Sequence, residues 1–262
     1  MTLPVEGTEI ARGATAVVRA GAAGTVVKEL LPGMPAVIVE LEARALAVAG
    51  NAGLRVPRLM ETRLEAEPPA LVMSRVNGVE LADAVVSLGP EETGQILADA
   101  QDLVRRVEAP ALMLSAKDYV RQGIDRAPLP SDVKIRVLGA LSELPDGDAL
   151  CHLDLHPRNI LWDGAATIID WNNGTRGDAA ADVARTLLLL EAQIHWVPAE
   201  HRDAARPLLA RQREAYRERT EQLAPGILDR SLAWRAPLAA MMLGETPPPG
   251  AVPWLEQLLR EA

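Results

Sequence analysis

Three oxygen-bearing side chains, Asp154, Asn159 and Asp170, stand inside one apolar stretch of this chain. The stretch covers residues 150–171 and reads LCHLDLHPRNILWDGAATIIDW. Burying a carboxylate without a partner is costly, so such groups usually pair, accept hydrogen bonds or bind a metal ion. Two carboxylates and one amide in a single buried segment therefore indicate a cation site.

A hairpin within this stretch would bring two of the three side chains together. The Asp-Gly pair between two short apolar runs is a turn signal. Strands over residues 160–162 and 167–169 with a four-residue loop would set Asn159 directly opposite Asp170. Opposed β-carbons lie roughly 5 Å apart, close enough for both side chains to reach one Mg²⁺. A two-residue loop would shift this register, and Asp154, on the preceding loop, would face the same cavity as a base.

Lys28 is a further residue whose type and position could serve chemistry. Lysine is scarce among the 27 basic residues, and this one ends the β-branched run Thr-Val-Val-Lys. Its choice over arginine suggests a need for a compact ammonium ion, although a solvent-facing lysine on an edge strand fits the same pattern. Glu40 and Glu42, on the helix expected next, could each reach back to it.

The elements that must position these residues fall into two parts. Residues 1–72 are predicted to form a small β-rich unit with one helix, with strands over 15–18, 25–30, 54–60 and 70–73 and the helix over 35–49. A hairpin loop is expected at 20–24. A turn at 12–15 contains Gly13, which could let backbone N–H groups approach a phosphate, or could simply serve the turn.

Beyond a connector at residues 74–78, the pattern is mainly helical. Pro90 is expected at the first position of a helix, and Ser131 is expected to cap another. The predicted helices cover residues 90–107, 117–126, 131–144, 179–197, 198–223, 228–243 and 253–261.

Composition narrows the class of protein. The 262 residues suit one large domain or two closely packed lobes, and a 48% hydrophobic content argues against disorder. The net charge of −9 argues against a nucleic-acid surface and permits a cationic substrate. Cys151 is the single cysteine and is expected in the core. No leader-like segment or membrane-length apolar run is visible, so a cytoplasmic protein without membrane association is expected; a monomer is compatible with the sequence.

These motifs resemble the catalytic signature of the protein-kinase-like superfamily, in the form found in the aminoglycoside phosphotransferase family of small-molecule kinases. The resemblance rests on His152-Leu153-Asp154 followed by Asn159, and on Ile168-Ile169-Asp170-Trp171. Residues 177–184, GDAAADVA, look like the family's Gly-Asp-Pro-x-x-Asp-Leu-Ala segment. Residues 71–78 resemble its hinge.

The resemblance implies an α+β, two-lobed protein-kinase-like fold. It places a nucleotide-binding lobe at residues 1–73, a hinge at 74–78, and a helical lobe with the catalytic loop and acceptor site at 79–262. The implied activity is transfer of the γ-phosphoryl group of ATP, with Mg²⁺, to a hydroxyl of a small molecule. Aminoglycosides and related amino alcohols or sugars are among the acceptors it allows.

Roles follow from the matched motifs. Asp154 would accept or orient the acceptor's hydroxyl proton, and Asn159 and Asp170 would hold magnesium. His152 and Asp182 would support the catalytic loop.

On the nucleotide side, Lys28 would contact the α- and β-phosphates, with Glu42 fixing its position. The backbone near Ser74 and Val76 would bond the adenine, and the turn with Gly13 would lie over the phosphates.

The chain departs from the family pattern at Leu153, which replaces a glycine, and at Ala179, which replaces a common proline. Three rival readings remain. His152, Asp154 and His156 alternate and could bind a metal in a hydrolase. A kinase-like module could bind nucleotide without catalysis. A protein kinase is the third, although residues 170–177 are too short for an activation segment.

Overall fold

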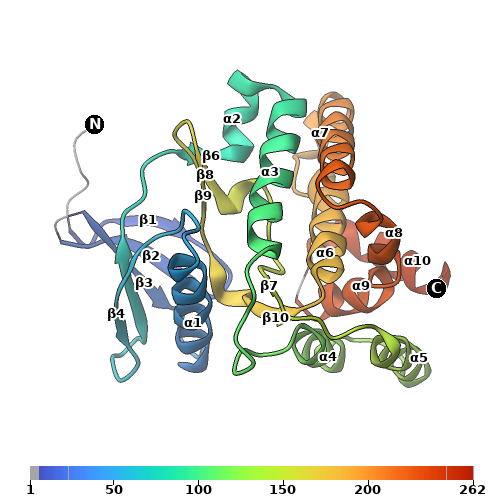
Figure 1. Cartoon of the computed structure of the whole chain (residues 1–262), viewed down its shortest axis with the longest axis horizontal. Coiled ribbons are helices and arrows are strands. Elements are labelled where there is room, and N and C mark those ends of the chain that lie inside the picture. The colour runs from blue at the N-terminus through green and yellow to red at the C-terminus, as the bar shows by residue number, and fades with distance from the viewer. Residues whose placement is uncertain (1–5, 23, 246, 262) are drawn as a thin grey trace.

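The computed structural model describes residues 6–22, 24–245 and 247–261 (Figure 1). The described residues do not include residues 1–5, Thr246 and Ala262, which fall in the two expected lobes. They also do not include Ala23, which falls in the expected hairpin loop. Among the described residues, no helix has both the length and the apolar character needed to cross a membrane.

The N-terminal part is a five-stranded antiparallel sheet with one long helix beside it (Figure 1). The strand order is β1-β2-β3-β5-β4. The elements are β1 Glu9–Arg12, β2 Ala16–Ala20, β3 Thr25–Leu30, α1 Val37–Asn51, β4 Leu59–Arg63 and β5 Ala70–Ser74. Helix α1 buries Val39, Ala45 and Leu46, which gives this part its own apolar contacts.

The rest of the chain is mostly helical. Its short strands are β6 Val79–Glu80, β7 Ala149–Cys151, β8 Ile160–Trp162, β9 Ala166–Ile168 and β10 Thr175–Gly177. Its α-helices are α2 Leu81–Leu88, α3 Pro90–Arg105, α4 Ala116–Arg126, α5 Ser131–Glu143, α6 Ala179–Ala192, α7 Arg202–Leu223, α8 Ile227–Leu232, α9 Arg235–Gly244 and α10 Val252–Glu261. The expected α+β, two-part kinase-like architecture is confirmed.

Several local predictions need correction. Strand β4 begins at Leu59 rather than at residue 54, because Pro57 has no N–H and the Arg55 carbonyl accepts a bond from Ile168 instead. Helix α2 was not expected; it ends at Gly89, which has φ +85°. The predicted cap at Ser131 is wrong, because Ser131 is already the first helical residue.

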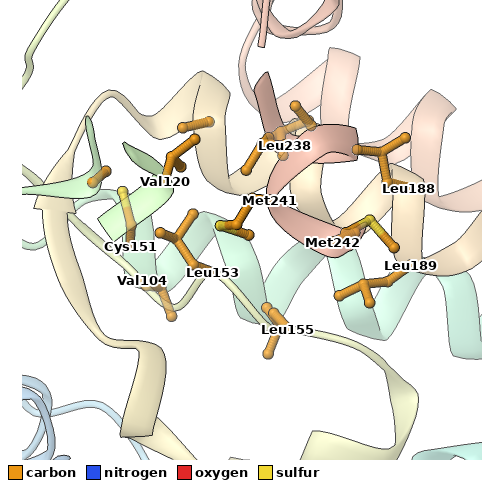
Figure 2. Packing of buried hydrophobic residues seen from close by; sticks show 14 of the residues in the cluster. Val104, Val120, Cys151, Leu153, Leu155, Leu188, Leu189, Leu238, Met241 and Met242 are labelled. Carbon is orange, nitrogen blue, oxygen red and sulfur yellow. The ribbon is translucent and has the colours of Figure 1, made fainter. Parts of the chain in front are cut away.

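The core of the helical part surrounds the segment that begins at the last residue of β7. Cys151, Leu153 and Leu155 point among side chains of α3, α4, α6 and α9, as Figure 2 shows. All three are fully buried, and burial raises the pKa of the Cys151 thiol well above its ordinary value. Alternate residues of this segment thus anchor it in the core, which leaves Asp154 between two buried leucines.

Candidate active site

The loop that carries Asp154 is held by a left-handed residue and a buried carboxylate. Leu153 has φ 53°, a conformation that costs a non-glycine residue about 1–2 kcal/mol. Its N–H donates to Asp182 Oδ1 at 2.6 Å, and Asp182 on α6 is fully buried, which raises the pKa of that carboxyl. The buried Leu153 side chain contributes about 1.5–3 kcal/mol, enough to offset the backbone cost. This explains how leucine occupies a position where the family pattern has glycine.

Asp154 lies beside a buried arginine. Arg185 of α6 donates from Nε to the Leu153 carbonyl at 3.1 Å, and its guanidinium lies 3.6 Å from Asp154 Oδ1. The same guanidinium donates to Glu245 at 2.6 Å. Burial raises the pKa of Asp154 to about 6 although Arg185 opposes the shift. The Asp154 side chain is still 24% exposed, so a solute can reach it.

Asn159 joins Asp154 to the hairpin. Its side-chain amide donates to the Asp154 carbonyl at 2.8 Å and to Asp154 Oδ2 at 3.3 Å. The side-chain nitrogen of Asn159 is therefore engaged in hydrogen bonds to Asp154, and no described residue donates to Asn159 Oδ1. That oxygen is available as a ligand for a cation.

The predicted hairpin register is wrong by one residue. Ile160 pairs with Ile168, and the Ile169 N–H donates to the Asn159 carbonyl at 2.9 Å. Asn159 is therefore opposite Ile169, and Asp170 lies one position further along. Asp170 takes a left-handed conformation, φ 64°, and its Oδ1 meets Lys28. The hairpin loop has three residues, whereas the two-residue and four-residue loops considered from the sequence would each set another register.

Lys28 of β3 connects the sheet to the segment after β9. Its Nζ donates to both oxygens of Glu42 at 2.7 and 2.8 Å and to Asp170 Oδ1 at 2.6 Å. Burial alone would lower the pKa of Lys28, but the two carboxylates raise it above its ordinary value. Burial would raise the pKa of Asp170, but Lys28 keeps it below its ordinary value. The helix partner is Glu42, which is 3% exposed, and Glu40 is exposed to solvent.

His152 has structural contacts. Its Nε2 lies 3.0 Å from the Ile169 carbonyl, and its ring packs against Trp171 at 4.8 Å. His156 is different: burial lowers its pKa to about 4, and its Nε2 is 3.9 Å from Asp154 Oδ2. No group of three or more His, Cys, Asp or Glu side chains in the described residues could hold a metal by itself. The hydrolase reading based on alternating histidines therefore has no support in the geometry.

The residues expected at the nucleotide differ in which hydrogen-bonding groups they leave without a partner. Ser74 uses its N–H on the Arg58 carbonyl at 2.9 Å, and its hydroxyl accepts from the Arg58 N–H at 2.8 Å. The Ser74 N–H is therefore occupied, while its carbonyl and its hydroxyl proton can still contact a ligand, and the Val76 N–H has no partner among the described residues. Gly13 closes the β1–β2 turn by donating to the Ala16 carbonyl at 2.9 Å. A β-carbon there would meet no close neighbour, so sterics do not demand glycine.

Arg185 and Glu245 were not anticipated from the sequence. Arg185 follows Asp182 by three residues, a spacing that puts two side chains on the same side of a helix, so the pattern contained a usable signal. Glu245 lies 60 residues beyond Arg185, and only packing of α9 against α6 brings it close.

Similarity to known proteins points to a family of phosphotransferases. The model of the phosphotransferase enzyme family, APH, matches residues 6–220. Curated proteins gave no sequence match. Among solved structures, the chain is similar to the aminoglycoside phosphotransferase APH(4)-Ia, with 15% identity, a TM-score of 0.66, and coverage of 97% of this chain and 91% of the other.

Two further structures have the same fold. An aminoglycoside phosphotransferase from Streptomyces rimosus, in complex with ADP and streptomycin, has 18% identity, a TM-score of 0.61, and coverage of 86% of this chain and 90% of the other. A choline/ethanolamine kinase family protein from Mesorhizobium loti has 16% identity, a TM-score of 0.60, and coverage of 97% and 85%. The family model spans most of the chain, so this protein belongs to the phosphotransferase enzyme family.

Proposed function

We propose that this kinase transfers the γ-phosphoryl group of ATP to a hydroxyl of a small molecule. The observation that carries the proposal is the set of contacts joining the sheet to the hairpin. Lys28 donates a hydrogen bond to Asp170, and Asn159 donates one to Asp154. An ammonium group, two candidate metal ligands and a candidate base therefore lie close together. Phosphoryl transfer requires mainly positioning and charge neutralisation, which such side chains supply.

The base in this proposal is Asp154. With a pKa of about 6, it is mostly ionised at neutral pH and can accept the hydroxyl proton as the phosphoryl group is transferred. Arg185 holds this carboxylate, and Asp182 fixes the loop through the Leu153 N–H. His152 supports the segment from beneath through Ile169.

The donor set fits Mg²⁺. Asn159 Oδ1 and the Asp170 oxygen not bonded to Lys28 are free of donors among the described residues. Mg²⁺ commonly takes one or two protein carboxylates and completes its shell with phosphate oxygens and water, so a larger protein cluster is unnecessary. Bound there, the ion would neutralise charge on the phosphates.

We assign the nucleotide to the sheet beside Lys28 of β3. Lys28, kept charged by Glu42 and Asp170, would contact the α- and β-phosphates. The Ser74 carbonyl and the Val76 N–H would bond adenine, and the turn with Gly13 would cover the phosphates. We accordingly assign residues up to 73 to a nucleotide lobe, 74–78 to a hinge and 79 onward to the acceptor lobe. A cytoplasmic reaction is expected, because ATP is supplied there.

The test is ATP consumption with Mg²⁺ across a panel of small alcohols. Amino alcohols, sugars and aminoglycosides come first, because similar folds were solved with streptomycin, hygromycin B and amicoumacin. Asp154→Ala should abolish transfer and retain ATP binding. Asp163→Ala, on the same hairpin but ion-paired at the exposed surface with Arg55, is the matched control and should stay active. Full transfer by Asp154→Ala would refute the assigned base; ATP binding without transfer to any alcohol would favour a non-catalytic module.

A further inference from the structure

Helix α6 holds the backbone on both sides of Asp154. Before it, the Leu153 N–H donates to Asp182 at 2.6 Å. After it, the Thr186 hydroxyl donates to the Leu155 carbonyl at 3.0 Å. Asp182 and Thr186 are four residues apart, a spacing that puts both side chains on one face of the helix. The proposed base therefore lies between two residues whose backbone is hydrogen-bonded to α6.

The Thr186 hydroxyl acts outside its own helix. A threonine hydroxyl within a helix commonly bonds the carbonyl three or four residues earlier. Thr186 is fully buried, and its hydroxyl bonds a carbonyl of another segment instead. Leu155, labelled in Figure 2, is also fully buried, so its carbonyl would be costly to leave without a donor.

Two further buried side chains direct the hydrogen of the Thr186 hydroxyl. Gln101 of α3 donates from Nε2 to Thr186 Oγ1 at 2.9 Å. Its Oε1 accepts a hydrogen bond from the hydroxyl of Tyr216 on α7. Because the threonine oxygen already accepts from Gln101, its single hydrogen is directed to the Leu155 carbonyl. A reversed amide would present Oε1 to Thr186 and compete for that hydrogen; by donating to Oε1, Tyr216 stabilises the observed orientation.

We propose that Thr186 is a positioning residue that holds Asp154 at the acceptor hydroxyl by way of the Leu155 carbonyl. Gln101 and Tyr216 act through Thr186, because they set the direction of its hydrogen. The inference rests on the proposed function, in which Asp154 is the base. Asp154 belongs to no helix or strand, so its place depends on contacts of this kind.

The effect of such a contact should appear in kcat. A misplacement of about 1 Å caused by a change remote from the chemistry can cost about a hundredfold in rate. The nucleotide is assigned to the sheet beside Lys28, and Thr186 has no hydrogen bond to that part of the chain. Loss of the Thr186 hydroxyl should therefore leave the KM for ATP largely unchanged.

The chain contains a matched control for this hydrogen bond. Gln212 of α7 donates from Nε2 to Thr93 Oγ1 of α3, also at 2.9 Å, and both side chains are buried. The Thr93 hydroxyl bonds carbonyls at the start of its own helix and no residue of the loop that carries the base. Thr186→Val and Thr93→Val thus each remove one buried Gln–Thr hydrogen bond and retain the side-chain shape. Only the first should affect catalysis.

Steady-state kinetics with MgATP test the proposal, with water and with the most active alcohol of the panel as acceptors. Thr186→Val should lower kcat about tenfold or more and leave the KM for ATP within about twofold of the wild type. Thr186→Ser keeps the hydroxyl and should restore most of kcat. Thr93→Val should keep the wild-type kcat. Tyr216→Phe, which leaves the Gln101 amide free to turn, should lower kcat by less than Thr186→Val does.

Equal kcat values in the two valine variants, a loss confined to the KM for ATP, or a serine variant as slow as Thr186→Val would overturn the proposal. If Thr186→Val fails to fold, Tyr216→Phe decides, and a wild-type kcat in that variant would overturn the proposal.

Hydrogen exchange across residues 152–156 is a second test, which uses neither ATP nor an acceptor. Exchange there should be faster in Thr186→Val than in Thr93→Val, and equal rates in the two variants would refute the role of Thr186. A wild type that transfers phosphate to no acceptor would count against the proposed function alone, because hydrogen exchange would still show whether Thr186 fixes the loop.

Discussion

Replacing Lys28 by methionine probes the buried network that joins the two parts of the molecule. The ammonium contacts Glu42, whose side chain is 4% exposed, and Asp170, whose side chain is 39% exposed. Asp170 can turn to water, but Glu42 is left as a buried carboxylate without its cation. Removing one partner of a buried ion pair costs about 3–5 kcal/mol. In a chain of this size, the melting temperature should fall on the order of 10 °C.

The pH dependence of that loss has a defined sign. Burial already raises the pKa of Glu42 in the intact protein, with Lys28 opposing the shift. Without Lys28, the folded-state pKa rises further above the unfolded value. Stability is then greatest below the unfolded pKa, where Glu42 is protonated in both states, and it falls as pH rises through the folded pKa. The destabilisation should accordingly be larger at alkaline than at acidic pH.

Guanidinium titrations at two pH values measure the effect. Lys134→Met is the matched control, because among the described residues Lys134 Nζ donates only to the Asp125 carbonyl, at the exposed surface. It should change stability by less than about 1 kcal/mol. The double variant Lys28→Met with Glu42→Leu should regain much of the stability, since an apolar pair can replace a buried ion pair, while transfer stays abolished. A loss below about 1 kcal/mol for Lys28→Met, or a loss independent of pH, would refute the reasoning.

Three further outcomes are expected. Activity should rise with pH through the pKa of Asp154, about 6. Arg185→Met should move this rise in activity to higher pH, because it removes the positive charge that opposes the upward shift of that pKa, whereas Arg185→Lys should not. Identical pH profiles for the two variants would contradict this. Leu153→Gly should destabilise the protein by about 1–3 kcal/mol in denaturant titrations, since lost burial outweighs the relief of φ 53°, and a gain in stability would reverse that ranking. Chelation by EDTA should stop transfer without lowering the melting temperature of the nucleotide-free protein, because the proposed magnesium ligands are completed only by phosphates; a lowered melting temperature would indicate a structural ion.

The local pattern of the sequence determined much of what the chemistry uses. Asp154, Asn159 and Asp170 stand out because short polar side chains interrupt an apolar stretch, and Lys28 because lysine is scarce and this one ends a β-branched run. Helix α3 begins at Pro90 as predicted, and Cys151 lies in the core. These features depend on neighbouring residues and on burial, which a sequence records directly.

Tertiary structure decided which of these groups meet. The hairpin register follows from the turn geometry, which an Asp-Gly pair does not specify, and a shift of one residue moved Asp170 from Asn159 toward Lys28. The choice of Glu42 over Glu40 depends on how α1 rotates against the sheet. Glu245 reaches Arg185 only through helix packing. Contacts between distant segments depend on the packing of whole elements, which no local pattern contains.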